Sequence, residues 1–264
     1  MRVAVISDVH GRADALASAA RDADALVCLG DFVLFVDYED HGQGIMGSLF
    51  GRDAVSAYVS LRTARRYADA RAHAGTLWGS LGSAREAVVA EVVRRQYDEQ
   101  LAALAATGVP VYLTVGNVDV PPVLREALAA LGAPPERLRF LDGEAVDIGG
   151  RRFGFVGGGL TSPMRTPFEV DEATYAAALA GLGPVDVLAV HVPPDLPELT
   201  YDVVARRFET GSRPTLETVR REQPGHVLFG HVHQPLVQRM RLGRTEAVNV
   251  GHFRQTRRAF HLEW

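Results

Sequence analysis

Five short apolar runs, each ending in side chains that can bind a metal ion, limit the possible folds of this chain more than any other feature. The runs cover residues 3–6, 25–29, 111–115, 187–190 and 227–229, and short β-branched-rich runs are typical of buried strands. The groups that follow them are Asp8-Val9-His10, Gly30-Asp31, Gly116-Asn117-Val118-Asp119, His191 and Gly230-His231-Val232-His233. Functional groups in α/β proteins gather beyond the carboxyl ends of strands, so the side chains converge if the five strands share one edge.

Two of these groups contain pairs of metal-capable side chains two residues apart. Side chains at positions i and i+2 of an extended chain point the same way, so Asp8 and His10 can reach one ion together, as can His231 and His233. A glycine precedes Asp31, Asn117 and His231, and glycine permits the sharp, close-approach backbone of a strand exit. A single pair of this kind is usually a chance or surface feature, whereas all five groups in order favour a metal site.

The chemistry of the donors favours transition metals. Mixed imidazole, carboxylate and amide ligands suit Mn, Fe, Zn, Co or Ni. Two such ions about 3.5–4 Å apart can clamp the attacking and leaving oxygens of an in-line phosphoryl displacement, and bound water loses its proton near neutral pH. The pattern therefore predicts phosphoester hydrolysis by attack of a metal-bound hydroxide.

The ordered set D-x-H, G-D, G-N-x-D, H and G-H-x-H resembles the calcineurin-like metallophosphoesterase superfamily over nearly the whole chain. The segments Gly157–Pro163, Thr166–Phe168 and His191–Pro194 are also similar to bacterial and archaeal members. The resemblance implies an α/β fold: a two-sheet β-sandwich flanked by helices, in one domain over residues 1–264. It implies that Asp8, His10, Asp31 and His233 hold the first metal, and that Asp31, Asn117, His191 and His231 hold the second, with Asp31 as the bridge.

The resemblance implies a dinuclear metal-dependent phosphoesterase, with manganese as the preferred ion. We expect a small phosphodiester, nucleotide-type substrates included, because a monoester dianion rewards extra cations and the motif loops supply only Arg12, with Arg165 in reserve. Asn117 and Arg12 are the candidate substrate-binding residues, although Arg12 fits a solvated position equally well. Two alternatives stay open: a phosphomonoesterase or nucleotidase, and a non-catalytic metal-binding scaffold like a retromer subunit of this fold.

One position departs from the family pattern. Many members have histidine after the G-N motif, as a proton donor to the leaving group, and here Val118 stands there. Loss of a general acid typically costs ~10²–10⁴-fold in rate. His41 and His252 are candidate substitutes, although a lone histidine is more often a surface or core residue. Asp119 has a local interpretation as the N-terminal cap of the next helix, where proline is welcome.

A long segment separates the second and third groups. Between Asp31 and Asn117 lie 85 residues, where a crossover needs only about a dozen. Helices are predicted over Asp53–His73 and Ser83–Ala106, the second with the capping-box spacing of Ser83 and Glu86. Residues 37–82 form a predicted helical insertion, with three interpretations: a cap over the site, a homodimer interface, or a peripheral packing element.

The composition argues against several classes of partner and reaction. A net charge of −4 gives no broad basic surface, so nucleic acid is not expected as an obligate partner. The chain contains no lysine, which excludes Schiff-base chemistry and a P-loop lysine. Its one cysteine, Cys28, lies in a predicted core strand, and no stretch approaches the ~20 apolar residues of a membrane span. We expect a cytoplasmic protein without a membrane partner.

The other elements follow from periodicity and turn residues. Helices are expected over residues 13–21, 122–131 and 171–180, and strands over 139–143, 145–148 and 151–156. The chain end is expected to form a three-stranded meander over residues 235–241, 246–250 and 258–262.

Overall fold

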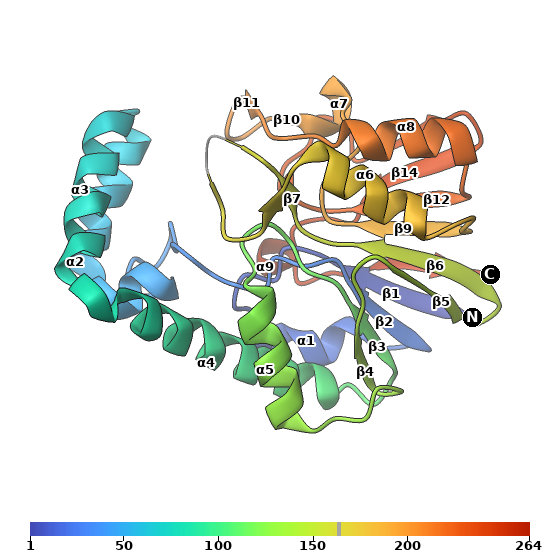
Figure 1. Cartoon of the computed structure of the whole chain (residues 1–264), viewed down its shortest axis with the longest axis horizontal. Coiled ribbons are helices and arrows are strands. Elements are labelled where there is room, and N and C mark those ends of the chain that lie inside the picture. Colours follow the sequence, from blue (N-terminus) through green and yellow to red (C-terminus); the bar gives the residue numbers. More distant parts are fainter. Residues whose placement is uncertain (163–164) are drawn as a thin grey trace.

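Two sheets stack face to face in the computed structural model, which describes residues 1–162 and 165–264 (Figure 1). The first sheet has the order β15-β1-β2-β3-β4, and only β15 runs antiparallel to its neighbour. Its strands are β1 (Arg2–Ile6), β2 (Ala25–Cys28), β3 (Val111–Leu113), β4 (Leu138–Phe140) and β15 (Phe260–Glu263). The second sheet has the order β13-β14-β12-β9-β6-β5. Its strands are β5 (Glu144–Ile148), β6 (Arg151–Val156), β9 (Val187–Val190), β12 (His226–Phe229), β13 (Arg239–Leu242) and β14 (Thr245–Asn249).

Alternation along β1 explains the layers. Val3 and Val5 are fully buried between the sheets, where they belong to one core with Phe153 of β6 and Leu228 of β12. Ile6 faces the other way, into a core shared with three helices. Those helices are α1 (Ala13–Ala19), α4 (Arg85–Ala105) and α5 (Pro121–Leu131). The expected two-sheet sandwich flanked by helices is confirmed.

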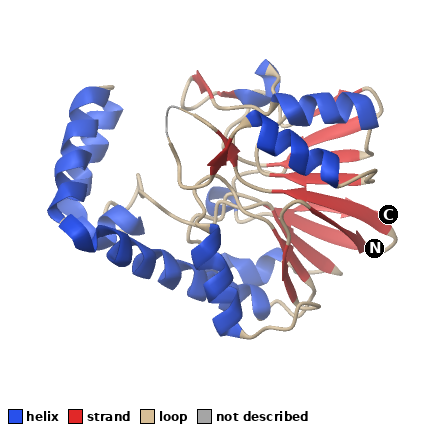
Figure 2. Cartoon of the chain, in the orientation of Figure 1, coloured by secondary structure: helices blue, strands red, loops and turns tan. Residues whose placement is uncertain are grey.

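The outer face of the second sheet is covered by α6 (Glu172–Gly181) and α8 (Arg213–Glu222) (Figure 2). Each begins with a side-chain cap, because Asp171 accepts the Thr174 N–H and Ser212 accepts the Thr215 N–H. Two small ribbons complete the strands: β7 (Gly159–Leu160) with β8 (Glu169–Val170), and β10 (Tyr201–Asp202) with β11 (Arg207–Phe208).

The five motif strands do not share one edge, which was the condition for convergence, because β1, β2 and β3 belong to the first sheet and β9 and β12 to the second. Several local predictions were wrong. The expected C-terminal meander is split, because β13 and β14 pair with each other while β15 crosses to β1. This crossing lets Leu262 reach the core between the sheets, and it brings the two termini together through the Met1 N to Trp264 O hydrogen bond of 2.7 Å.

The helix predicted over Asp53–His73 is two helices, α2 (Gly44–Thr63) and α3 (Tyr67–Ser80). The chain turns between them at Arg65, whose φ is 58°. The predicted capping box of α4 is also wrong, because Ser83 lies in the 3₁₀ turn η1 (Gly82–Ala84) rather than in an extended cap position.

The paired helices α2 and α3 stand apart from the two sheets, at the end of α4 (Figure 1). They carry a small core of their own, formed by Met46, Val55 and Val59 against Leu77 and Trp78. The assignment of residues 37–82 as an insertion, and its role, stay predictions. None of the helices in the described part of the chain is long and apolar enough to span a bilayer.

Candidate metal centre

The seven predicted metal residues lie together, in loops that follow five strands of the two sheets. Loops after β1, β2 and β3 supply Asp8, His10, Asp31 and Asn117, and loops after β9 and β12 supply His191, His231 and His233. Most of these side chains are buried, and His233 is 39% exposed, so the group opens toward solvent on its side.

One half of the group surrounds His10. Its Nε2 lies 3.3 Å from His233 Nε2, 3.8 Å from Asp8 Oδ1 and 3.8 Å from Asp31 Oδ2. His233 Nε2 is also 3.3 Å from Asp8 Oδ1. The mutual spacings of Asp8, His10 and His233 suit donors to one ion at ordinary coordination distances, and Asp31 Oδ2 lies beside them.

The other half surrounds Asn117 Oδ1. It lies 3.1 Å from His191 Nε2 and 2.9 Å from His231 Nδ1. His191 Nε2 is also 3.4 Å from Asp31 Oδ2, the same oxygen that approaches His10. Asp31 Oδ2 therefore lies between the two halves.

Hydrogen bonds behind the rings point acceptor atoms at one another. His10 Nδ1 donates to Val33 O at 3.0 Å and His191 Nδ1 donates to Leu29 O at 3.0 Å, so in the neutral rings both Nε2 lone pairs face the site. Asp8 Oδ1 is buried and, although His233 Nε2 lies 3.3 Å away, it forms no hydrogen bond in the described part of the chain. Converging acceptors of this kind require a cation or a proton between them, and the donor set fits divalent metal ions.

Without a metal, a proton fills part of this role. Burial by itself lowers the pKa of His191, but the carboxylates of Asp31 and Asp8 outweigh it and raise that pKa to about 9. Burial likewise opposes ionisation of Asp31, and the charge of His191 overcomes it and lowers the pKa of Asp31 to about 2. A divalent ion would replace the His191 proton.

Left-handed backbone aims several of the side chains. The φ angles are 57° at Asp8, 40° at His10, 55° at Asp31 and 66° at His231, a region that costs non-glycine residues on the order of 1–3 kcal/mol each. The expectation that Asp8–His10 and His231–His233 are extended is therefore wrong, although both pairs still converge. Concentrated backbone strain is typical of functional sites.

Glycines let the loops touch. A Cβ added at Gly116 would overlap the Asp31 carboxylate, and one at Gly230 would overlap Ser7 and the Asp8 carboxylate. Asp8 Oδ2 accepts the His231 N–H at 3.0 Å, which ties a loop of the first sheet to a loop of the second. The expected close approach is confirmed at both glycines.

Asp119 does not cap α5, whose first turn has no side-chain cap. Its carboxylate is fully buried and accepts N–H groups from Asp31 at 2.8 Å, Phe32 at 3.0 Å, Val33 at 3.3 Å and Gly116 at 2.7 Å. It also accepts the Tyr97 hydroxyl of α4 at 3.1 Å, and burial together with the Asp31 charge raises the pKa of Asp119 to about 7. Asp119 thus holds the loop that carries Asp31, which its place before a helix could not reveal.

The other predicted residues fall in different places. Arg12 approaches Asp14 at 3.9 Å, and within the described residues it forms no ion pair or hydrogen bond with the seven. His41 Nδ1 lies 2.7 Å from Ser56 Oγ of α2. His252 stacks on His233, with ring centroids 3.8 Å apart, so His252 is the candidate donor that lies at the site. Burial, and next the neighbouring His233, lower the pKa of His252 to about 3.

The Gly-rich segment after β6 does border the site, since Thr166 Oγ1 accepts the Asn117 Nδ2–H at 3.2 Å. Pro163, part of the same predicted segment, lies outside the described residues. Sequence reasoning missed Arg254, whose Nη1 donates to His10 O at 2.6 Å and whose Nη2 donates to the buried Asp37 at 2.5 Å. No local signal marks Arg254, because both partners are more than 200 residues away.

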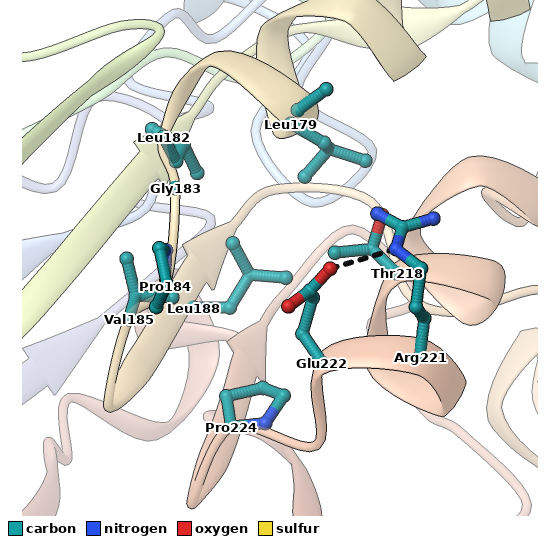
Figure 3. Close-up of a pocket in the computed structure, with 11 residues that line it drawn as sticks. Leu179, Leu182, Gly183, Pro184, Val185, Leu188, Thr218, Arg221, Glu222 and Pro224 are labelled. Carbon is teal, nitrogen blue, oxygen red and sulfur yellow. Dashed lines mark hydrogen bonds and ion pairs between the residues drawn. The ribbon is translucent and has the colours of Figure 1, made fainter.

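A hollow between α6 and α8 is separate from this centre (Figure 3). Leu179, Leu182 and Leu188 give it an apolar wall, and the Arg221–Glu222 ion pair of 2.7 Å lies at its side. None of the seven metal residues lines it.

Comparison with known proteins agrees with this geometry. A sequence profile described as calcineurin-like phosphoesterase matches residues 1–235. One crystal structure is 17% identical, with a TM-score of 0.64 over 96% of this chain and 91% of its own. The crystal structure of TT1561 of Thermus thermophilus is 14% identical, with a TM-score of 0.61 over 99% of this chain and 98% of its own. At these identities the two structures show the fold alone, and no curated protein matches.

Proposed function

The chain belongs to the calcineurin-like phosphoesterase family, whose members are metal-dependent phosphoesterases that typically bind two divalent ions, and we propose that this one hydrolyses phosphodiesters. The observation that carries the proposal is the convergence of the seven ligands about Asp31 Oδ2, 3.8 Å from His10 Nε2 and 3.4 Å from His191 Nε2. Asp8, His10, Asp31 and His233 would hold a first ion, and Asp31, Asn117, His191 and His231 would hold a second, with Asp31 shared between the two. Manganese is the preferred ion.

When bound, such ions polarise the phosphoryl group and lower the pKa of a water molecule. The protein's own contribution is orientation. Asp8 and Asp31 each use one oxygen to accept a backbone N–H, of His231 and Val118 respectively, and keep the other for the centre. His10 and His191 are fixed by carbonyl oxygens behind their rings.

The few available cationic side chains and the missing proton donor at position 118 favour a diester substrate over a monoester. Val118 packs against the apolar core and cannot move a proton. Arg12 forms no ion pair or hydrogen bond with the seven within the described residues, with Asp14 at 3.9 Å as its ion-pair neighbour, and Arg254 is committed to Asp37 and the His10 carbonyl. A monoester dianion would profit from free guanidinium groups here, whereas a diester with a good leaving group needs neither extra charge nor a strong acid.

The test combines metal analysis with a substrate panel. We expect two ions per chain after saturation with Mn²⁺, and a higher kcat/KM for aryl diesters than for the matching monoesters. Asp31→Asn should weaken both sites, His233→Ala mainly the first and His191→Ala mainly the second. At most one ion per chain would refute the dinuclear site. Faster monoester hydrolysis would indicate a nucleotidase, and two ions without hydrolysis a scaffold.

The apolar side chain at Val118 leads to a further prediction about the leaving group of the substrate. Without a proton donor, the rate should fall steeply as the pKa of the leaving group rises. Val118→His should help alkyl diesters more than aryl diesters, and Val118→Ala should not. The gain should stay below the ~10²-fold typical of a general acid, because Asp119 is occupied by backbone groups and cannot orient the new ring. The measurement is kcat/KM across both ester series, and a flat dependence in the wild type would contradict the reasoning.

A further inference from the structure

His252 lies at the candidate metal centre but is not one of the seven predicted metal-binding residues. His252 lies at the start of the short helix α9 (Phe253–Thr256), which the fold places among the metal-bearing loops (Figure 1). The first N–H groups of α9, at Phe253 and Arg254, donate to Ser7 O and Asp8 O, both at 3.0 Å. His252 is therefore held against the loop that carries Asp8.

The ring of His252 is close to two predicted ligands of the first metal. A ring nitrogen of His252 lies within 4.8 Å of ring nitrogens of His10 and His233. Its Nε2 is buried and has no hydrogen-bond partner in residues 1–162 and 165–264. A buried polar atom left without a partner is costly, so this nitrogen is available to a hydrogen-bond partner from outside the protein.

The stacking of the His252 ring on the His233 ring limits which kind of atom this nitrogen can bind. The rings of His233 and His252 are nearly parallel, at 13°, with centroids 3.8 Å apart. A nitrogen lone pair of His233 points in the plane of its own ring, so a metal ion that His233 held would not lie where a lone pair of the stacked His252 ring points. His252 is thus badly placed to ligate that ion and well placed to reach an oxygen atom bound beside it.

We propose that His252 is a substrate-binding residue that donates a ring N–H hydrogen bond to a phosphoryl oxygen at the first metal. This inference rests on the proposed function. The open side of the centre agrees, because His233, the ring on which His252 stacks, is 39% exposed, whereas the His10 and His191 side chains are 13% and 0% exposed. The nearby Arg254 is directed elsewhere, to His10 O and Asp37, so His252 rather than Arg254 is available to donate at this side of the centre.

The test is binding of inorganic phosphate to the Mn²⁺-loaded protein, measured by calorimetry beside metal content and the melting temperature. His252→Phe keeps a flat ring on His233 and removes the N–H. His252→Ala removes both, and His252→Gln restores a donor. His261→Phe is the control, since His261 also has a buried, unpartnered Nε2 among the described residues but pairs with Ala4 on the sheet edge near Arg2 and Asp22.

We expect His252→Phe to retain two ions and to bind phosphate at least tenfold more weakly, the usual effect of losing a hydrogen bond to a charged group. His252→Gln should recover part of that loss, and His261→Phe should bind as the wild type does. Unchanged phosphate affinity in His252→Phe would overturn the proposal, and so would loss of an ion, which would make His252 a ligand. A wild type that binds phosphate through His252 but hydrolyses no ester would leave this inference standing and refute the proposed function.

Discussion

Tyr97 of α4 offers a sharp test of how the metal loop is supported. Its side chain is fully buried, 22 residues before Asp119 in the sequence. The hydroxyl donates to Asp119 Oδ1 at 3.1 Å and accepts the Val120 N–H at 2.8 Å. Tyr97→Phe keeps the ring and removes both bonds.

The expected loss follows from those two bonds. A hydrogen bond to a charged acceptor contributes about 1.5–3 kcal/mol, and a buried N–H left unpaired costs about 1–3 kcal/mol. Asp119 keeps its four backbone donors and Val120 N–H is only partly buried, so we expect a decrease of about 2–4 kcal/mol in the free energy of unfolding. Mn²⁺ affinity should fall less, because the residue 31–33 backbone stays tied to Asp119.

The assay is urea unfolding of the metal-free protein, which removes the contribution of bound metal to apparent stability. Tyr175→Phe is the matched control, because Tyr175 is also buried but its hydroxyl, with the Thr215 side chain near it, makes no hydrogen bond of ordinary geometry in the described structure. It should leave stability unchanged or raise it slightly. A cost below about 0.5 kcal/mol for Tyr97→Phe, or equal costs for the two variants, would refute the reasoning, since surface-like effects are of that size.

Three other predictions test the site and its surroundings. Gly116→Ala forces a methyl group against the Asp31 carboxylate and should lower both the melting temperature and the Mn²⁺ content, whereas Gly75→Ala, in open space on α3, should stabilise by about 0.5–1 kcal/mol; equal effects would contradict the packing argument. Arg254→Met leaves the buried Asp37 carboxylate unpaired and should cost about 3–5 kcal/mol in urea unfolding, with part of the loss recovered by adding Asp37→Asn. Replacing the α2–α3 hairpin by a short loop should preserve Mn²⁺ content and change the ratio of kcat/KM for large and small diesters; an unchanged ratio would count against a cap, and loss of a dimer in sedimentation would support the interface interpretation.

That the seven residues of the five groups meet, and that their donor atoms suit a divalent metal, follows from the sequence alone. Short apolar runs form strands because strands buried on both faces need continuous β-branched side chains, and this requirement is local. The order of the polar groups after the runs then predicted the seven converging residues, and the close approaches at Gly116 and Gly230 followed from the absence of a Cβ.

How those residues are held depends on the three-dimensional arrangement, because the contacts that hold them join distant parts of the chain. The motif strands divide between two sheets, and Asp8 reaches across to the His231 N–H over a separation of 223 residues. Asp119 has the local surroundings of a helix cap, yet its buried carboxylate gains more from four converging N–H groups and a tyrosine hydroxyl than a solvated helix end offers. The orientation of His252 depends on its stacking against His233, which residue types and spacing do not encode.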